Sequence, residues 1–130
     1  MSHFNWKEFY NVGNHLNNFS KEESYQRSAI GRYYYSCFGT VKEYYEKSFR
    51  KTLSSTNAHK TLIKYLLNSP FIEEQEVGNI LDNLRNNRNY ADYNSKKLCN
   101  RLVSESKKDV EKIFSILNDL HENPLRIIKN

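Results

Sequence analysis

The sequence predicts an all-α fold, an antiparallel bundle of about five helices. The 130 residues include only four glycines and two prolines, too few for the many turns of a β-sandwich. Apolar residues also recur at helical spacing between short polar breaks. A chain of this length buries roughly two-thirds of its unfolded surface around one core. We therefore expect a single domain over 1–130, with its core over about 5–121 and a flexible C-terminal tail over 122–130.

Capping patterns mark the first two helices. Asn5 with Glu8 three residues later forms a capping box, which predicts a helix to about residue 18. Ser20 begins the same pattern and predicts a longer helix to about residue 49. We expect the inner face of this second helix to contain Ala29, Ile30, Tyr33 or Tyr34, Cys37, Phe38, Val41, Tyr44 and Tyr45.

The second helix also carries features that suggest contact with another backbone. Gly31 and Gly39 lie on roughly one side of it, where small residues permit close approach. The consecutive tyrosines 33–35 cannot all face one way, so one or two of them must lie at a surface or an interface. We favour an interface between subunits.

Three shorter patterns predict the remaining helices. A polar break precedes a helix over about 57–67, with Leu62, Ile63 and Leu66 turned inward. Glu73 and Glu74 favour the N-terminus of a fourth helix, which ends near residues 92–94. Ser95 is then expected to cap the last helix, which runs to about residue 121.

Composition favours a cytoplasmic protein that can contact a polyanion. The net charge is +5 and the isoelectric point is about 9.1. Cys37 and Cys99 show no metal-ligand spacing, so we expect reduced core residues and no metal or other cofactor. The N-terminus lacks a secretory pattern, and no apolar run is long enough to predict a membrane span. Motifs typical of ATPases, dinucleotide enzymes, zinc proteases and α/β-hydrolases are also missing.

The fourth predicted helix has a charged stripe beside an apolar face. Successive side chains of a helix are 100° apart, so those of Arg85, Arg88 and Asp92 fall within about 60° of one another. Two guanidiniums on one face in this way suit binding to a phosphate backbone. The alternative is a solvated helix face with an Arg88–Asp92 ion pair. The neighbouring face expected in the core consists of Val77, Ile80, Leu81, Leu84 and Ala91.

Two segments together resemble the HEPN family. Residues 27–38 contain an arginine, small residues and a tyrosine pair in the order found in the long second helix of HEPN proteins. Residues 88–93 are similar to the Arg-x-x-Ala-Asp-Tyr form of the family signature, and His59 lies where related chains often carry a histidine. The resemblance covers about 6–120 and implies a dimeric helical bundle. It also implies metal-independent ribonuclease activity in bacterial defence, toxin–antitoxin or RNA-processing systems.

The resemblance and the charged stripe together define candidate site residues. In the cleavage that the resemblance implies, Arg85 and Arg88 would hold the scissile phosphate, Asp92 would manage a proton, and Tyr93 would orient phosphate or act as an acid. A homodimer would place two such stripes in one cleft. We expect the catalytic residues to be Arg85, Arg88, Asp92 and Tyr93, and the RNA-binding residues to be Arg27, Arg32, His59 and Lys60.

Each assignment has an alternative. Arg27 and Arg32 can instead pair with acidic residues as part of the scaffold, and His59 can be a packing or capping residue. The usual catalytic signature of HEPN proteins is an arginine followed after a few residues by a histidine. Neither Arg85 nor Arg88 is followed by a histidine in its helix, and this difference supports a non-catalytic module that binds a partner protein or a nucleotide ligand. HEPN chains frequently work with a nucleotidyltransferase-type partner, for which Tyr93 would be a candidate modification site. A purely structural adaptor is the third possibility.

Overall fold

The computed structural model describes residues 3–122, and within them the all-α prediction is confirmed. The tail predicted over 122–130 falls, apart from its first residue, outside the described part of the chain. The helices are α1 (Glu8–Phe19), α2 (Glu23–Phe49), α3 (Ala58–Leu67), α4 (Ile72–Tyr93) and α5 (Asn100–Glu122).

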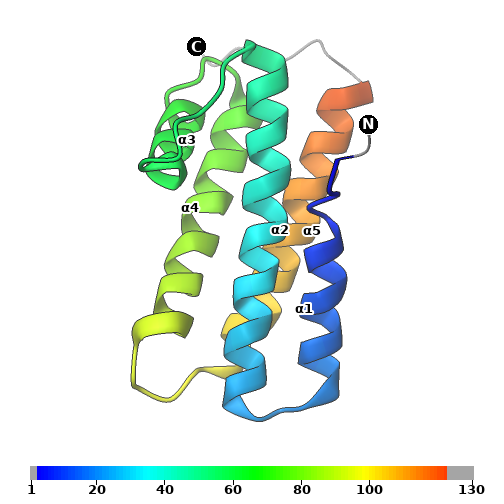
Figure 1. Ribbon diagram of the computed structural model, residues 1–130, viewed down its shortest axis with the longest axis vertical. Coiled ribbons are helices and arrows are strands. Elements are labelled where there is room, and N and C mark those ends of the chain that lie inside the picture. Colours follow the sequence, from blue (N-terminus) through cyan, green and yellow to red (C-terminus); the bar gives the residue numbers. More distant parts are fainter. Residues whose placement is uncertain (1–2, 123–130) are drawn as a thin grey trace.

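The four long helices form an antiparallel bundle (Figure 1). α1 and α4 run down the view, and α2 and α5 run up it. α2 packs against α1, α4 and α5, whereas the short α3 packs mainly on α4, beside the N-terminal part of that helix (Figure 1). α2 is therefore the central element, and the start of α3 lies close to both α2 and α4.

The core follows the predicted helical periodicity. The expected inner face of α4 is buried throughout, with Leu81 and Leu84 fully excluded from solvent. Tyr33 and Tyr34 are both fully buried, while Tyr35 stays partly exposed. One member of the tyrosine run thus lies at the surface of the described chain, as the sequence requires.

The glycines of α2 have different surroundings. Gly39 lies under the indole of Trp6, and an added Cβ there would come within 2.1 Å of the Trp6 ring. An added Cβ at Gly31 would meet nothing within 4 Å. At Gly39 the space is therefore filled by a side chain of the same chain, and not by another backbone as predicted.

Three predicted helix starts were too early. Asn5 Oδ1 accepts the Lys7 N–H at 3.1 Å in a turn, and α1 begins at Glu8. Ser20 Oγ accepts the Glu22 N–H at 3.0 Å, and α2 begins at the following residue. Both oxygens therefore satisfy a donor in the turn before the helix.

The predicted start of α5 was wrong by four residues, since a helix capped by Ser95 would begin at residue 96. Ser95 does not cap it, because α5 begins at Asn100. Side chains of α2 bind backbone groups of the intervening non-helical connection. Glu23 Oε1 accepts the Leu98 N–H at 2.6 Å, and Arg27 donates to the carbonyl of Lys96 at 2.7 Å. Contacts distant in sequence thus override the local capping signal. The Cys99 prediction was wrong for the same reason, since this thiol is exposed on the connection while Cys37 is buried as expected.

The acidic residues at the start of α4 do more than favour the helix dipole. Glu74 is fully buried. Its two carboxylate oxygens accept hydrogen bonds from the Ser69 hydroxyl at 2.6 Å and the Tyr44 hydroxyl at 2.5 Å. A buried carboxylate requires such partners, so Glu74 joins α2 to the α3–α4 turn. No helix within residues 3–122 has the length and apolar character of a membrane span.

Candidate functional site

Aromatic and basic side chains meet where the start of α3 approaches α2 and α4. We call this group the three-helix site. α2 contributes aromatic rings, α3 an imidazole, and α4 two guanidiniums with an acid and a phenol. Its members are Tyr34, Tyr35, Phe38, His59, Arg85, Arg88, Asp92 and Tyr93.

Arg88 is fixed by an acid and by aromatic rings. Its Nε lies 2.8 Å from Asp92 Oδ2, one helical turn away, and its side chain is only 20% exposed. The guanidinium carbon is 5.3 Å from the centroid of Tyr35 and 6.0 Å from that of Tyr34. The Tyr93 ring lies at the same 6.0 Å but is 75% exposed. Cation–π contacts and an ion pair together restrict the orientation of the guanidinium.

Arg85 lies one turn earlier on the same face of α4. It forms no hydrogen bond or ion pair with another residue in the described part of the chain. Its charge nevertheless acts on Tyr34 and His59, as does the charge of Arg88. The guanidinium donors of Arg85 are therefore available for an anion, beside a second guanidinium whose position is fixed.

His59 occupies an aromatic slot at the start of α3. Its Nδ1 lies 2.5 Å from the Tyr34 hydroxyl. The imidazole stacks on Phe38, with centroids 3.8 Å apart and planes 12° from parallel, and Tyr35 meets it edge-on at 6.1 Å. Ring stacking and the hydrogen bond thus determine which nitrogen faces Tyr34.

The ionisation of both partners follows from these surroundings. Burial lowers the pKa of His59 below its usual value, and the positive charges of Arg85 and Arg88 lower it further. Burial raises the pKa of the Tyr34 phenol far above its usual value, although the same two guanidiniums act in the opposite direction. At neutral pH the site therefore contains a neutral imidazole, a protonated phenol and two cations.

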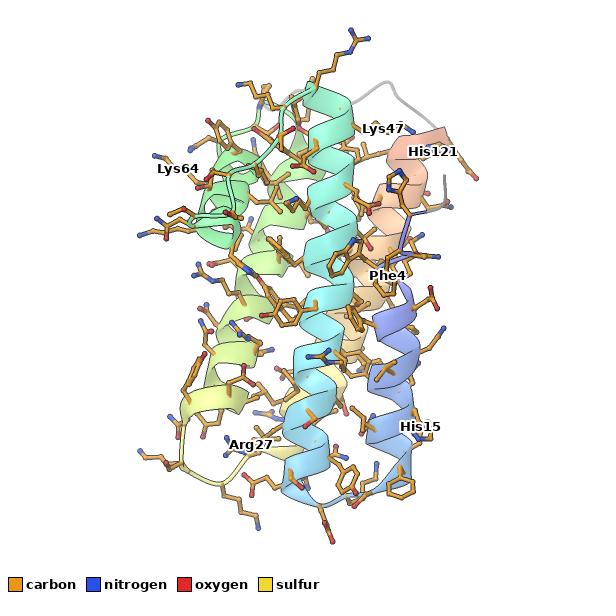
Figure 2. All side chains as sticks on the ribbon, viewed as in Figure 1. Phe4, His15, Arg27, Lys47, Lys64 and His121 are labelled. Carbon is orange, nitrogen blue, oxygen red and sulfur yellow. The ribbon has the colours of Figure 1, made fainter. Side chains whose placement is uncertain are left out.

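Arg27 does not join this site. It lies at the lower end of the bundle, beside the connection from α4 to α5 (Figure 2). Its guanidinium donates to the carbonyls of Ala91, Asn94 and Lys96 at 2.7–2.9 Å and pairs with Glu23 at 2.9 Å. The pairing with Glu23 is the scaffold alternative considered for this residue. Arg27 closes the C-terminus of α4, where free carbonyls favour a cation.

The other two predicted RNA-binding residues flank the three-helix site. The Arg32 guanidinium carbon lies 5.0 Å from the Phe9 centroid and 5.7 Å from the Tyr35 centroid. Tyr35 therefore has Arg32 and Arg88 on its ring. Lys60 is exposed next to His59 at the start of α3. Arg32 thus adds a cation on α2 and Lys60 one on α3 to the two guanidiniums of α4.

The sequence prediction missed the aromatic part of the site. Tyr34 and Phe38 were expected only as core residues, yet they hold His59 in place. Their spacing of four residues places both on one side of α2, which was a usable signal. No local pattern identified His59 as their partner, because 25 residues separate it from Tyr34.

Comparisons with known proteins assign no family to this chain. It matches no protein-family model, no curated protein and no solved structure at a significant level. Among the described residues, there is no cluster of three or more histidine, cysteine, aspartate or glutamate side chains suited to a metal ion. The functional argument therefore depends on the geometry of the three-helix site.

Proposed function

We propose that this protein is a HEPN-like, metal-independent endoribonuclease that binds RNA at the three-helix site, in a bacterial defence or toxin–antitoxin system. The observation that carries the proposal is the convergence of Arg85 and Arg88 with the Tyr34–His59 pair. Two cations beside an uncharged imidazole form a site with both anion affinity and a group that can exchange a proton near neutral pH.

The two arginines have complementary parts in this proposal. Arg85, with its donors available, binds the phosphate as RNA arrives. Arg88, already oriented by Asp92 and the Tyr35 ring, donates to the phosphorane as negative charge develops. A fixed donor of this kind accelerates acyl transfer by about 10²–10³-fold, and the same logic applies to phosphoryl transfer. Because Asp92 lies in an ion pair with Arg88, we assign it an orienting role.

Tyr93 gives the site an exposed aromatic surface. Its ring is 75% exposed, and the Arg88 guanidinium carbon lies over it at 6.0 Å from the ring centroid. An exposed ring beside a cation suits a stacked base whose phosphate the cation binds. Single-stranded RNA, in which bases are free to stack on a ring, is therefore the proposed substrate.

We further propose that the protein acts as a homodimer in the cytoplasm. Two three-helix sites facing each other across a twofold axis would double the positive charge along one RNA strand. Cys99, an exposed thiol without a disulfide partner, is compatible with a reducing compartment. Size-exclusion chromatography with light scattering measures the oligomeric state directly.

A second candidate function is a non-catalytic module that binds a partner protein, such as a nucleotidyltransferase, or a nucleotide ligand. Arg88 is already held by two neighbours: its Nε forms the ion pair with Asp92, and its Nη1 donates to Asn89 Oδ1 at 3.3 Å. An arginine held within its own helix in this way also suits a static binding surface. This function predicts RNA or nucleotide affinity without cleavage.

The deciding experiment incubates the purified protein with single-stranded RNA in the presence of a chelator. We expect wild-type protein to cleave the RNA and Arg88→Ala to lose cleavage. Arg101→Ala is the matched control, since it removes the same charge from the exposed start of α5. Equal cleavage by wild type and Arg88→Ala would remove the proposed site. Binding without cleavage would favour the second candidate.

A further inference from the structure

We infer that His59, held by Tyr34, is the general base of RNA cleavage at the three-helix site. This inference rests on the proposed ribonuclease function and goes beyond it by assigning the proton-accepting role, which the sequence analysis gave to Asp92 on α4, to an imidazole on α3. The geometry points to this residue because its Nδ1 is already occupied by the Tyr34 hydroxyl at 2.5 Å. Nε2 is then the nitrogen left for a substrate.

The orientation of the imidazole is fixed by neighbours on α2. Phe38 covers one ring face at 3.8 Å, and Tyr35 meets the ring edge-on. A phenol hydroxyl both donates and accepts, so Tyr34 can accept a hydrogen bond from Nδ1–H. In that tautomer the Nε2 lone pair is free. A base oriented by a third group through its other nitrogen is the arrangement required to activate a hydroxyl.

The charges around His59 keep it competent at neutral pH. The groups that face it are Tyr34 and Tyr35 from α2 and Arg85 and Arg88 from α4, with Lys60 adjacent on α3 itself. No carboxylate contributes to the shift of its pKa. Burial and the guanidiniums therefore favour the neutral form, which is the form that accepts a proton. Asp92, in contrast, is already engaged in the ion pair with Arg88.

The reaction balances without a metal or redox partner. Nε2 takes the proton of the ribose 2′-hydroxyl as the 2′-oxygen forms a bond to phosphorus. The bond from phosphorus to the 5′-oxygen breaks, and this oxygen takes a proton from water. The imidazolium then returns its proton to the hydroxide produced. The products are a 2′,3′-cyclic phosphate and a 5′-hydroxyl end.

The first test compares variants in the chelator assay. His59→Gln keeps a polar side chain without a titrating group, and we expect its kcat/KM to fall at least about 100-fold while RNA affinity changes little. His121→Gln, at the exposed end of α5, is the matched control and should cleave normally. RNA with a 2′-deoxyribose at the cleavage position should remain intact.

Tyr34→Phe tests the positioning role of the phenol. It keeps the buried ring and removes only the hydroxyl that holds Nδ1. We expect kcat to fall with KM unchanged and the acidic limb of the pH–rate profile to move to lower pH, because the imidazolium loses a hydrogen-bond acceptor. A purely structural role would leave that limb in place. Unchanged kcat and profile would overturn this role for Tyr34.

The second test does not depend on turnover. NMR of the imidazole groups follows His59 as pH is varied, with and without cytidine 3′-monophosphate. A phosphate bound by Arg85 and Arg88 should raise the pKa of His59 and leave His121 unaffected. No response of His59 at any probe concentration would overturn the inference. Wild-type cleavage with equal cleavage by His59→Gln would overturn the inference alone, whereas no cleavage by wild type would overturn the ribonuclease proposal as well.

Discussion

Two arginines of this bundle, Arg27 and Arg88, have opposite surroundings although both contact α4. Arg27 directs its donors at four backbone carbonyls and one carboxylate, all within the protein. Arg88 has one ion pair and one hydrogen bond, to Asn89 of its own helix, and otherwise lies against ring faces. Ring faces hold a guanidinium in place without using its N–H groups. A structural arginine therefore differs from one whose donors can reach a ligand in the kind of contact it makes, hydrogen bonds or packing on rings, more than in its burial.

Exposure alone does not distinguish these two arginines. The Arg27 side chain is 21% exposed and the Arg88 side chain is 20% exposed. The ion-pair partners also have the same spacing of four residues along a helix. The distinction is that the Arg27 contacts tie α2 to the end of α4 and to the α4–α5 connection, 63–69 residues away in sequence, whereas the Arg88 pair stays within α4.

The largest expected effect is on stability, at Arg27. Arg27→Ala leaves the carbonyls of Ala91, Asn94 and Lys96 without their charged donor. Hydrogen bonds to charged groups contribute about 1.5–3 kcal/mol each and are not additive, so we expect unfolding to become easier by about 3 kcal/mol. Urea denaturation followed by circular dichroism measures this change. Arg27→Lys should recover part of the loss, since an ammonium offers fewer donors in a different geometry.

Arg88→Ala should lower RNA affinity more than it lowers stability, the reverse of Arg27→Ala. An ion pair within a helix and a cation–π contact each contribute up to about 1 kcal/mol, so we expect a loss of only about 1 kcal/mol in unfolding free energy. RNA affinity should fall, and the slope of log affinity against log salt should decrease by about 1, corresponding to one fewer phosphate contact. Fluorescence anisotropy across a salt series provides the measurement. A large loss of stability with unchanged RNA affinity would show that Arg88 is a structural arginine like Arg27.

The same comparison shows which parts of the molecule the sequence could predict. The buried face of α4 and the Arg88–Asp92 pair depend on helical periodicity, which is local. The buried face was expected, and the ion pair was the alternative considered for the charged stripe. The ends of α2 and α3 were also anticipated, at residues 49 and 67. These features need only the geometry of one helix. That is why sequence reasoning reached them.

The remaining features depend on contacts between distant segments. The late start of α5 follows from Glu23 and Arg27, which occupy backbone groups of the connection from another helix. The Tyr34–His59 pair joins residues 25 positions apart, on different helices. Neither contact leaves a local pattern, because the partner is brought into place by packing. The sequence therefore marks His59 as a candidate without indicating its partner, and for Arg27 it indicates acidic partners such as Glu23 but not the carbonyls of the connection.

A smaller effect is expected between the two regions, at Gly31, which lies one turn after Arg27 and one turn before Tyr35 on α2. Alanine there meets no atom within 4 Å, and the exchange of glycine for alanine inside a helix is favourable by about 0.5–1 kcal/mol. Gly31→Ala should therefore stabilise the isolated chain by about that amount. The contrasting variant is Gly39→Ala, whose Cβ would overlap Trp6. Thermal denaturation of both should show shifts of opposite sign, and a dimer weakened by Gly31→Ala would indicate subunit contact at this position.

The smallest expected effect is the pH dependence of stability contributed by His59, for which the Arg27 region offers no counterpart near neutral pH. Its pKa in the folded protein is lowered by burial, Arg85 and Arg88, so the unfolded chain binds a proton more readily. This contribution is fully present above the ordinary histidine pKa of about 6.5 and decreases as pH falls from there through the folded value. The carboxyl of Glu23, whose pKa is lowered chiefly by Arg27, loses its contribution at more acidic pH. Denaturant titrations between about pH 5 and 8 should therefore show a shallow slope in wild type that flattens in His59→Gln, while Arg27→Ala retains it. If the slope persists in His59→Gln, it arises from another histidine. That result would contradict the electrostatic effect of Arg85 and Arg88 on His59.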